Sequence, residues 1–348
     1  MEAAWFVLIA FMLTVYVVLD GFDFGAGILH LFVAKTDDER RTVLSAIGPF
    51  WDGNEVWLVA AGGTLVFAFP RVYSVAFSGF YLPLMIVLWL LILRGVSIEF
   101  RSHQSNPLWR SFWDATFALA SLLIALVLGA SLGNLIRGVP LDSTGYFRAP
   151  LFTDFRTGPE PGALDWYTIL VAVFVALVLA GHGALFLFWK TSGTVAQRSE
   201  RLARRIWILV LPVAIVATIG TSYVQPAIFK MLISRPWTWP LLLVAVAALA
   251  VVYLSLGRRK ELSAFLGSAG FIAGMLAITA AEMFPTILPS TLDPASSLTV
   301  WNSSSGRTGL LIGLVWWIPA VLLAIAYFVY LFRSFRGKVT LKPATDGY

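Results

Sequence analysis

The sequence predicts an all-α polytopic membrane protein with about nine transmembrane helices, and three observations support this fold class. Of the 348 residues, 59% are hydrophobic and only 13% are charged, whereas soluble domains carry roughly 25% charged residues. The mean hydropathy is +0.82. The apolar runs are continuous and reach the roughly 20 residues that cross a bilayer core, and they lack the in-and-out alternation of an outer-membrane barrel.

Nine candidate spans occur in succession along the chain. They cover residues 5–33, 51–70, 76–95, 113–134, 165–189, 205–224, 238–256, 262–284 and 308–332. The second and third spans are separated by only a few residues around Pro70 and Arg71, so we expect a tight helical hairpin there. Pro212, Pro226 and Pro240 are expected to kink or bound their helices, which a bundle tolerates because neighbouring helices satisfy the freed backbone groups.

The longest predicted external loop, residues 135–164, divides the chain into two parts. Residues 1–134 form an N-terminal half of four spans that carries the acidic motifs. Residues 165–348 form a C-terminal half of five spans with a cytoplasmic tail. This division predicts two four-helix bundles plus one extra helix, although the halves show no convincing sequence repeat.

Lysine and arginine are distributed unequally between alternate loops. One set of loops and the C-terminal tail contain 18 of these residues, and the opposite set contains 7. The richer set includes the predicted loop residues Arg94, Arg101 and Arg110 and the tail residues Arg333, Arg336, Lys338 and Lys342. Because cytoplasmic loops carry the excess of basic residues, we expect the N-terminus outside and the C-terminus in the cytoplasm.

Composition also limits the chemistry that the chain can perform. Cysteine is absent, which excludes disulfides, thiolate metal sites and cysteine nucleophiles. The three histidines, His30, His103 and His182, leave little capacity for haem or metal ligation, so no metal site is expected in this chain. The net charge of +6 reflects membrane topology, and it does not indicate binding to nucleic acid.

The stretch DGFDFGAGILH places unusual polarity in the cytoplasmic half of the first predicted span. Four of its residues share one helical face, at spacings of 3, 4 and 3: Asp20, Asp23, Gly27 and His30. Gly21 and Gly25 form a GxxxG pair that allows close approach of a second helix. Helix packing alone explains the glycines. The acids form either a buried structural network or a functional site, since ionisable groups at membrane depth are costly.

The second predicted span begins with further acids, in IGPFWDGNEVWLVAAGG. Asp52 and Glu55 lie about one turn apart at its cytoplasmic end, beside Trp57. Together with Asp20 and Asp23 they are expected to cluster on the cytoplasmic side of the bundle, as the parts of a proton uptake path. The alternative is that Asp52 and Glu55 are first-turn residues favoured by the helix dipole.

Three further polar residues carry weaker signals. His182 lies mid-span between glycines and is interpreted as a hydrogen-bonded core histidine in preference to a ligand or proton relay. Asp114 is interpreted as a helix cap. Glu282, near the outer end of the eighth span, fits an exit path and an interface position equally well.

Several motifs occur together and in order: DGFDFGAG, PFWDGNEVW, GFYLPLMIVL and RGVSIEFR within residues 19–101, and AEMFPTILPSTLDPASSLTVWNSSSG within residues 281–306. In this combination the chain closely resembles subunit II of the cytochrome bd-type quinol oxidases of bacteria. The chain length, the number of spans and the predicted orientation agree with the resemblance along the whole sequence.

The resemblance implies a terminal oxidase of the bacterial inner membrane that oxidises ubiquinol or menaquinol and reduces oxygen to water. Protons for water would come from the cytoplasm, so charge would be separated without pumping. Two b-type haems and one d-type haem would belong to the partner, subunit I, and none to this chain. The quinol site would lie in a large external loop of subunit I, and the short segment 225–237 here argues for subunit II. Small single-span accessory subunits and a structural quinone occur in some members, and the sequence leaves both open.

Roles carry over only where the motifs match. Asp52 in WDGNEVW corresponds to the acid of the proton path at the subunit interface, and Trp57 resembles the tryptophan beside an oxygen route to the d-type haem. Asp20 and Asp23 match the DGFD element and are expected, with Glu55, to support Asp52.

Two alternatives to the oxidase subunit remain open. One is a proton-coupled secondary transporter, although the paired broken helices of many transporters are not evident. The other is a purely structural assembly subunit.

Overall fold

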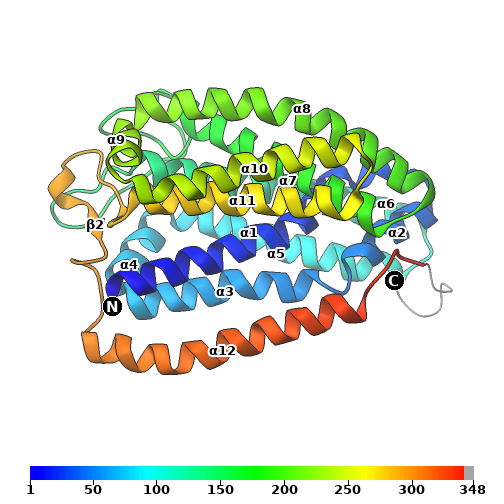
Figure 1. Cartoon of the computed structure of the whole chain (residues 1–348), viewed down its shortest axis with the longest axis horizontal. Helices are drawn as coiled ribbons and strands as arrows, with labels where there is room; N and C mark the ends of the chain where they lie inside the picture. The colour runs from blue at the N-terminus through cyan, green and yellow to red at the C-terminus, as the bar shows by residue number, and fades with distance from the viewer. Residues whose placement is uncertain (341–348) are drawn as a thin grey trace.

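The computed structural model describes residues 1–340, as a bundle of long helices that run along its longest axis (Figure 1). In chain order the helices and strands are α1 (Glu2–Val33), α2 (Asp37–Ile47), α3 (Trp51–Ala68), α4 (Pro70–Gly79), α5 (Tyr81–Phe100), a 3₁₀ turn (Arg101–His103), α6 (Pro107–Arg137), α7 (Trp166–Lys190), α8 (Gly193–Val224), α9 (Pro226–Ser234), a 3₁₀ turn (Pro236–Thr238), α10 (Trp239–Gly257), α11 (Glu261–Met283), β1 (Thr286–Leu288), a 3₁₀ turn (Pro294–Ser296), β2 (Leu298–Thr299) and α12 (Arg307–Ser334).

Each predicted span corresponds to one long helix, and eight of these helices are long and apolar enough to cross a membrane. The remaining one is α3, which has 18 residues and begins with the polar sequence WDGNE. Figure 1 shows α3 running beside α1 and α12, in the place predicted for the second span. The all-α, multi-pass fold class is therefore confirmed. Of the tail residues, Lys342 lies outside the described part of the chain.

The predicted tight hairpin between the second and third spans is wrong. The helix α3 ends at Ala68, and a separate short helix, α4, precedes α5. Pro70 is the first residue of α4, a position that proline favours because its missing N–H has no partner to lose there. As a result the third span begins at Tyr81 and ends at Phe100, five residues later than predicted at each end.

Two other helices begin earlier than hydropathy indicated. The helix α6 begins at Pro107, where the side chain of Asn106 accepts a hydrogen bond from the N–H of Leu108 at 2.8 Å. The helix α8 begins at Gly193 and runs through a charged segment before its apolar part. Hydropathy detects only the apolar part of such helices, because their first turns lie in a polar environment.

The long helices form two groups. The first contains α1, α3, α5 and α6, and the second contains α7, α8, α10 and α11. The groups are joined where α1 and α6 pack against α7 and where α1 packs against α11. The helix α12 lies on the outside next to α3 (Figure 1), which agrees with two four-helix groups and one extra helix.

The helix α1 is central to this arrangement, and every residue from Asp20 to Gly27 is buried. It meets α7 backbone to backbone, at Gly25 and Gly183. A Cβ atom at Gly25 would lie 2.0 Å from the carbonyl oxygen of Leu179, and a Cβ atom at Gly183 would lie 2.3 Å from the carbonyl carbon of Gly25. The GxxxG pair of the sequence therefore contributes to a helix contact that admits no side chain.

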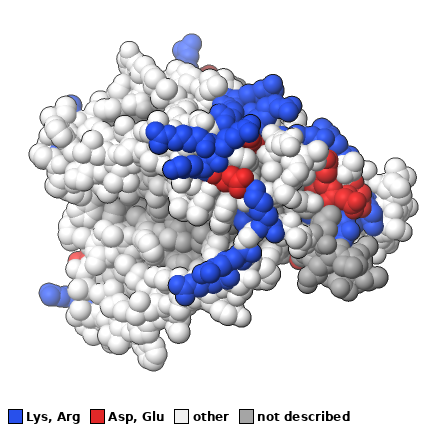
Figure 2. All heavy atoms as spheres, turned by 45° about the vertical axis from the view of Figure 1, so that its right-hand side comes forward, with Lys and Arg blue, Asp and Glu red and all other residues white. Residues whose placement is uncertain are grey.

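Basic residues gather at one end of the bundle, which we call the basic end (Figure 2). Here α1, α5, α7 and α10 end and α2, α6, α8 and α11 begin. Apart from Arg94, which is buried inside α5, and Lys342, which lies outside the described residues, the Lys and Arg residues from which the cytoplasmic side was predicted belong to the segments at this end. The orientation in the membrane stays a prediction.

We expect Gly25→Ala to destabilise the protein by about 3 kcal/mol or more, because overpacking costs about 1–3 kcal/mol even where side chains can adjust, and the atoms met here are backbone. The measurement is the midpoint of thermal unfolding of the purified protein. Gly257→Ala is the matched control, since a Cβ atom at Gly257 meets nothing within 4 Å. Equal midpoints for the two variants would contradict the close contact.

Candidate functional site

A buried ion-pair cluster joins α1, α3 and α5. Arg94 of α5 donates from Nη1 to Oδ1 of Asp20 at 2.7 Å, and from Nη2 to Oε1 of Glu55. Asp20 and Arg94 are fully buried, whereas Glu55 is one-quarter exposed. The guanidinium carbon of Arg94 also lies 4.4 Å from the centre of the Phe24 ring. A single cation therefore bridges two acids that the sequence places 35 residues apart.

Asp23 lies in the same buried region and has an amide partner. Asn54 of α3 donates from Nδ2 to Oδ2 of Asp23 at 2.7 Å and to the carbonyl oxygen of Leu19 at 3.2 Å. Three carboxyl groups, those of Asp20, Asp23 and Glu55, therefore surround one guanidinium. Oδ2 of Asp20, Oδ1 of Asp23 and Oδ1 of Asn54 are buried without a hydrogen-bond partner in residues 1–340.

The prediction that Arg94 lies in a basic loop is wrong. Arg94 lies inside α5 and is fully buried, because the third span extends five residues further than predicted. One signal could have located it. Buried acids need a nearby cation, since an unpaired buried charge is strongly destabilising, and Arg94 is the first basic residue after the acidic motifs of the first two long helices, apart from Arg71 at the opposite end of the second span.

The structure brings Asp20, Asp23 and Glu55 together, whereas Asp52, one turn before Glu55 on α3, makes no hydrogen bond or ion pair with them. Asp52 is exposed on the first turn of α3, and its side chain makes no hydrogen bond or ion pair within the described chain. Val56 and Val59 come after it at helical spacing and are 58% and 73% exposed. Asp52 therefore begins an outward-facing, otherwise apolar face of α3 in the isolated chain.

Trp57 lies on the opposite side of α3 and is buried. Its Nε1 atom has no hydrogen-bond partner among the described residues. It borders an open cavity of about 270 Å³, a groove at the surface of the isolated chain between α1, α3 and α12. The other side chains that line this cavity are all apolar: Phe11, Val15, Leu19, Ile325, Phe328, Val329 and Phe332.

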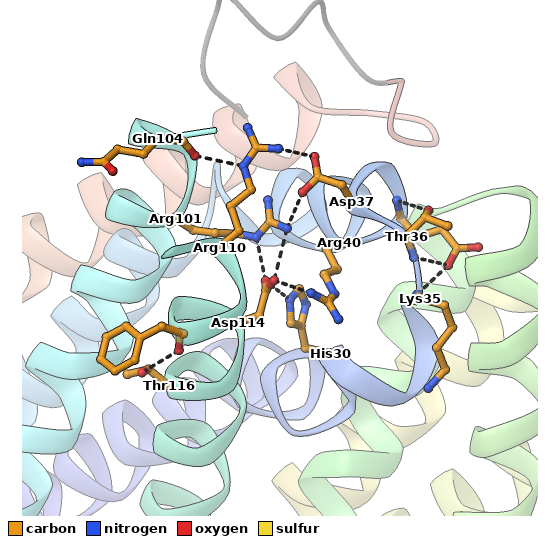
Figure 3. A network of polar contacts seen from close by, with 12 residues as sticks. His30, Lys35, Thr36, Asp37, Arg40, Arg101, Gln104, Arg110, Asp114 and Thr116 are labelled. Carbon is orange, nitrogen blue, oxygen red and sulfur yellow. Dashed lines mark hydrogen bonds and ion pairs between the residues drawn. The ribbon is translucent and has the colours of Figure 1, made fainter. Parts of the chain in front are cut away.

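A second cluster surrounds Asp114 near the basic end (Figure 3). Oδ1 of Asp114 accepts from Nε of Arg101 at 2.6 Å and lies 2.6 Å from Nε2 of His30. Oδ2 accepts from Nη1 of Arg40 at 2.8 Å. His30, Arg101 and Asp114 are almost completely buried. We call these four residues the Asp114 cluster.

The interpretation of Asp114 as a helix cap is wrong. Asn106 caps α6, and Asp114 lies two turns inside the helix. Its partners were not predicted, because they come from α1, α2 and the 3₁₀ turn after α5. Their common position depends on the packing of α1 and α5 against α6.

The short helix α2 holds Arg40 in place through a network of its own. Thr36 and Glu39 form a capping box at its start. Glu39 also accepts hydrogen bonds from Thr194 at 2.6 Å and from Arg198 at 2.7 Å, both of α8. Burial alone would raise the pKa of Glu39, but the hydrogen bonds from Thr194, the Lys35 N–H and Arg198 outweigh it and lower this pKa to about 2. Glu39 is therefore ionised at neutral pH, and it fixes α2 to α8.

His182 is a hydrogen-bonded core residue, as the sequence indicated. Its Nε2 lies 3.0 Å from the carbonyl oxygen of Val18, and its Nδ1 lies 2.6 Å from Oγ of Ser268. Because a carbonyl only accepts, Nε2 carries a proton. Oγ of Ser268 also lies 2.7 Å from the carbonyl oxygen of Phe265, so the serine hydroxyl is shared between Nδ1 and that carbonyl. Glu282 is 4% exposed, and neither of its carboxylate oxygens has a hydrogen-bond partner within residues 1–340.

In the described part of the chain, no three His, Cys, Asp or Glu side chains come together as a group that could hold a metal ion.

The sequence model of the family described as cytochrome bd terminal oxidase subunit II matches residues 1–335. The chain belongs to this family. It is thus a multi-pass membrane subunit of a quinol oxidase complex, which implies a subunit I partner and haem cofactors on that partner.

Individual relatives match over nearly their whole length. The chain is 32% identical over 342 residues to the cytochrome bd ubiquinol oxidase subunit 2 of Bacillus subtilis, covering 97% of this chain and 96% of that one. It is 30% identical over 364 residues to the cytochrome bd-I ubiquinol oxidase subunit 2 of Escherichia coli, covering 97% and 94%. The fold is similar to a chain of the bd oxidase from Geobacillus thermodenitrificans, with a TM-score of 0.74, 20% identity, and coverage of 96% and 98%.

We expect Arg94→Leu to destabilise the protein by about 3–5 kcal/mol, because it leaves Asp20 and Glu55 without their cation. The measurement is again thermal unfolding of the purified complex. Arg205→Leu removes an exposed arginine of α8 and is the matched control. If Arg94→Leu unfolded at the temperature of the control, the ion-pair cluster would not contribute to stability.

Proposed function

We propose that this chain delivers protons from the cytoplasm toward subunit I of a bd-type quinol oxidase in the bacterial plasma membrane. Subunit I would carry two b-type haems and one d-type haem and would reduce oxygen to water. The histidines of this chain fit that assignment, because Nε2 of His30 and both ring nitrogens of His182 already have hydrogen-bond partners. The proposal also replaces the secondary-transporter alternative, for which the family gives no support.

The observation that carries the proposal is the excess of carboxyl groups over cations in the buried cluster. Asp20, Asp23 and Glu55 share one guanidinium, and Arg94 donates to only two of them. Asp23 has only the neutral amide of Asn54. A carboxyl that no cation neutralises is the group best able to take up and release a proton within an apolar bundle. Asp23 is therefore the central proton carrier of the proposed route.

A line of buried polar atoms supports a connection from Asp23 to the basic end. Gly27 lies one turn after Asp23 on the same face of α1, and a Cβ atom there would lie 2.0 Å from Oγ of Ser121. That Oγ and Nδ1 of His30 are buried without partners in the described chain. His30 in turn contacts Asp114. Buried waters that form two to four hydrogen bonds to such polar atoms are a regular part of protein interiors. Waters of this kind would connect Asp23 to His30 by hydrogen bonds.

Asp52 is proposed as a second entry, at the contact with subunit I. A carboxyl on an apolar, outward-facing helix is costly in lipid, and the exposed face of Asp52, Val56 and Val59 is suited to cover by a partner subunit. Glu55 lies on the next turn of α3 and would link this entry to Arg94 and Asp20.

We expect Asp23→Asn and Asp52→Asn each to lower quinol oxidase turnover by roughly tenfold to 100-fold, since each removes a proton-carrying group at almost constant shape. Turnover and the haem absorption spectrum are measured on the purified complex, and proton uptake on reconstituted vesicles. Glu160→Gln, at an exposed position in the loop 138–165, is the control. Unchanged turnover and proton uptake would contradict the proton route. Loss of haem together with activity would instead support a purely structural subunit.

The apolar cavity beside Trp57 supports a further role as an oxygen route. Oxygen is small and apolar, so it prefers apolar surroundings to water. Every side chain that lines the cavity beside Trp57 is apolar.

Filling this cavity tests the oxygen route. We expect Val15→Phe to raise the apparent KM for oxygen severalfold and to leave kcat at saturating oxygen unchanged. Val246→Phe, on an exposed position of α10, is the matched control. An oxygen KM equal to that of the control would exclude a route through this cavity.

A further inference from the structure

A polar cavity of about 190 Å³ opens at the basic end, between the starts of α2 and α6. Six residues line it: Asp37, Arg40, Ser105, Pro107, Arg110 and Ser111. We call it the α2–α6 pocket. Figure 3 shows that Asp37 and Arg110 face one another beside the Asp114 cluster, with Arg40 reaching in from α2.

The acids of this region are already paired with arginines. Asp37 accepts from Nη2 of Arg101 and from Nη1 of Arg110, both at 2.8 Å. Asp114 accepts from Arg40 and Arg101. Among these five side chains, three guanidinium groups therefore face two carboxylates, which leaves one positive charge in excess.

Several donors of the region have no acceptor. Nε of Arg40, a residue that lines the pocket, is buried without a partner in the described chain. Nη1 of Arg101 is also buried without a partner, although Arg101 does not line the pocket and reaches it only through its ion pair with Asp37. Ser105 and Ser111 are exposed serines that line the pocket. Buried donors without an acceptor are rare in native proteins. Arginine forks and hydroxyl groups are the donors that recognise phosphate oxygens, so the pocket is suited to a phosphate group.

The rim of the pocket continues into an apolar surface. Leu108, Phe112 and Leu119 are 82%, 60% and 58% exposed. Their spacings of 4 and 7 residues place them on one face of α6, which leads away from the pocket along a helix that is apolar enough to span the membrane. A ligand that fills both regions has a phosphate at one end and hydrocarbon chains at the other.

We propose that the α2–α6 pocket binds the phosphate of an anionic phospholipid headgroup, with the acyl chains along Leu108, Phe112 and Leu119. Basic pockets at the cytoplasmic ends of transmembrane helices are suited to such lipids because charge and apolar contact act together. The lipid would connect α2 to α6, the two helices that supply Arg40 and Asp114. The proposal does not depend on the proton route.

Native mass spectrometry of the purified complex tests this proposal, after mild delipidation and with phosphatidylglycerol and phosphatidylethanolamine as probes. Arg110→Gln removes a pocket cation. Ser111→Leu fills the pocket without removing an ion pair, so its effect cannot arise from loss of the Asp37 contacts. Arg201→Gln, at an exposed position of α8 at the same end, is the matched control.

We expect the wild type and Arg201→Gln to retain one more phosphatidylglycerol molecule per complex than Arg110→Gln and Ser111→Leu. The affinity of these two pocket variants for phosphatidylglycerol is expected to fall about tenfold, or about 1.4 kcal/mol. Equal retention by all four proteins would overturn the proposal, as would equal retention of phosphatidylethanolamine at this site. Competition with inorganic phosphate identifies the source of the phosphate. If free phosphate displaced the lipid at comparable concentration, the acyl chains would contribute nothing and the lipid assignment would be wrong.

Discussion

Burying three carboxyl groups inside an apolar bundle costs free energy that a nearby cation must offset, and Arg94 is that cation. Its guanidinium holds Asp20 of α1 and Glu55 of α3 from its place in α5. The first three long helices are thereby fixed relative to one another at the depth of the acids. Because Arg94 donates to only two of the three carboxyl groups, Asp23 has no cation partner, and the proposed proton route depends on this.

Close helix packing places this cluster at the centre of the molecule. The contact of Gly25 with Gly183 brings α1 against α7, and Gly27 brings it against Ser121 of α6. With small residues on these sides, the acids of α1 face α3 and α5.

The sequence predicted the fold class and each long helix, because continuous apolar runs have few alternatives in a membrane protein. It also predicted a cluster of Asp20, Asp23, Asp52 and Glu55 from their helical spacing and depth. Asp20, Asp23 and Glu55 do lie in one buried region, whereas the Asp52 side chain is exposed and makes no ion pair or hydrogen bond within the described chain. It did not predict the role of Arg94, because hydropathy alone does not distinguish an arginine near the end of an apolar run from a loop residue, and the need of the buried acids for a nearby cation was not applied. The Asp114 cluster was missed for a related reason, since its members come from four segments whose contact depends on tertiary packing. The helix α4 was missed because Pro70 indicates a break in a helix but does not distinguish a turn from the start of a new helix.

The central claim is that a carboxyl of this chain changes its protonation during turnover. Infrared difference spectroscopy of the complex, between the quinol-reduced and oxygen-exposed states, tests it most directly. We expect a change in the C=O stretch of a protonated carboxylic acid that disappears in Asp23→Asn and persists in Glu282→Gln. A signal that remains unchanged in Asp23→Asn would contradict the account.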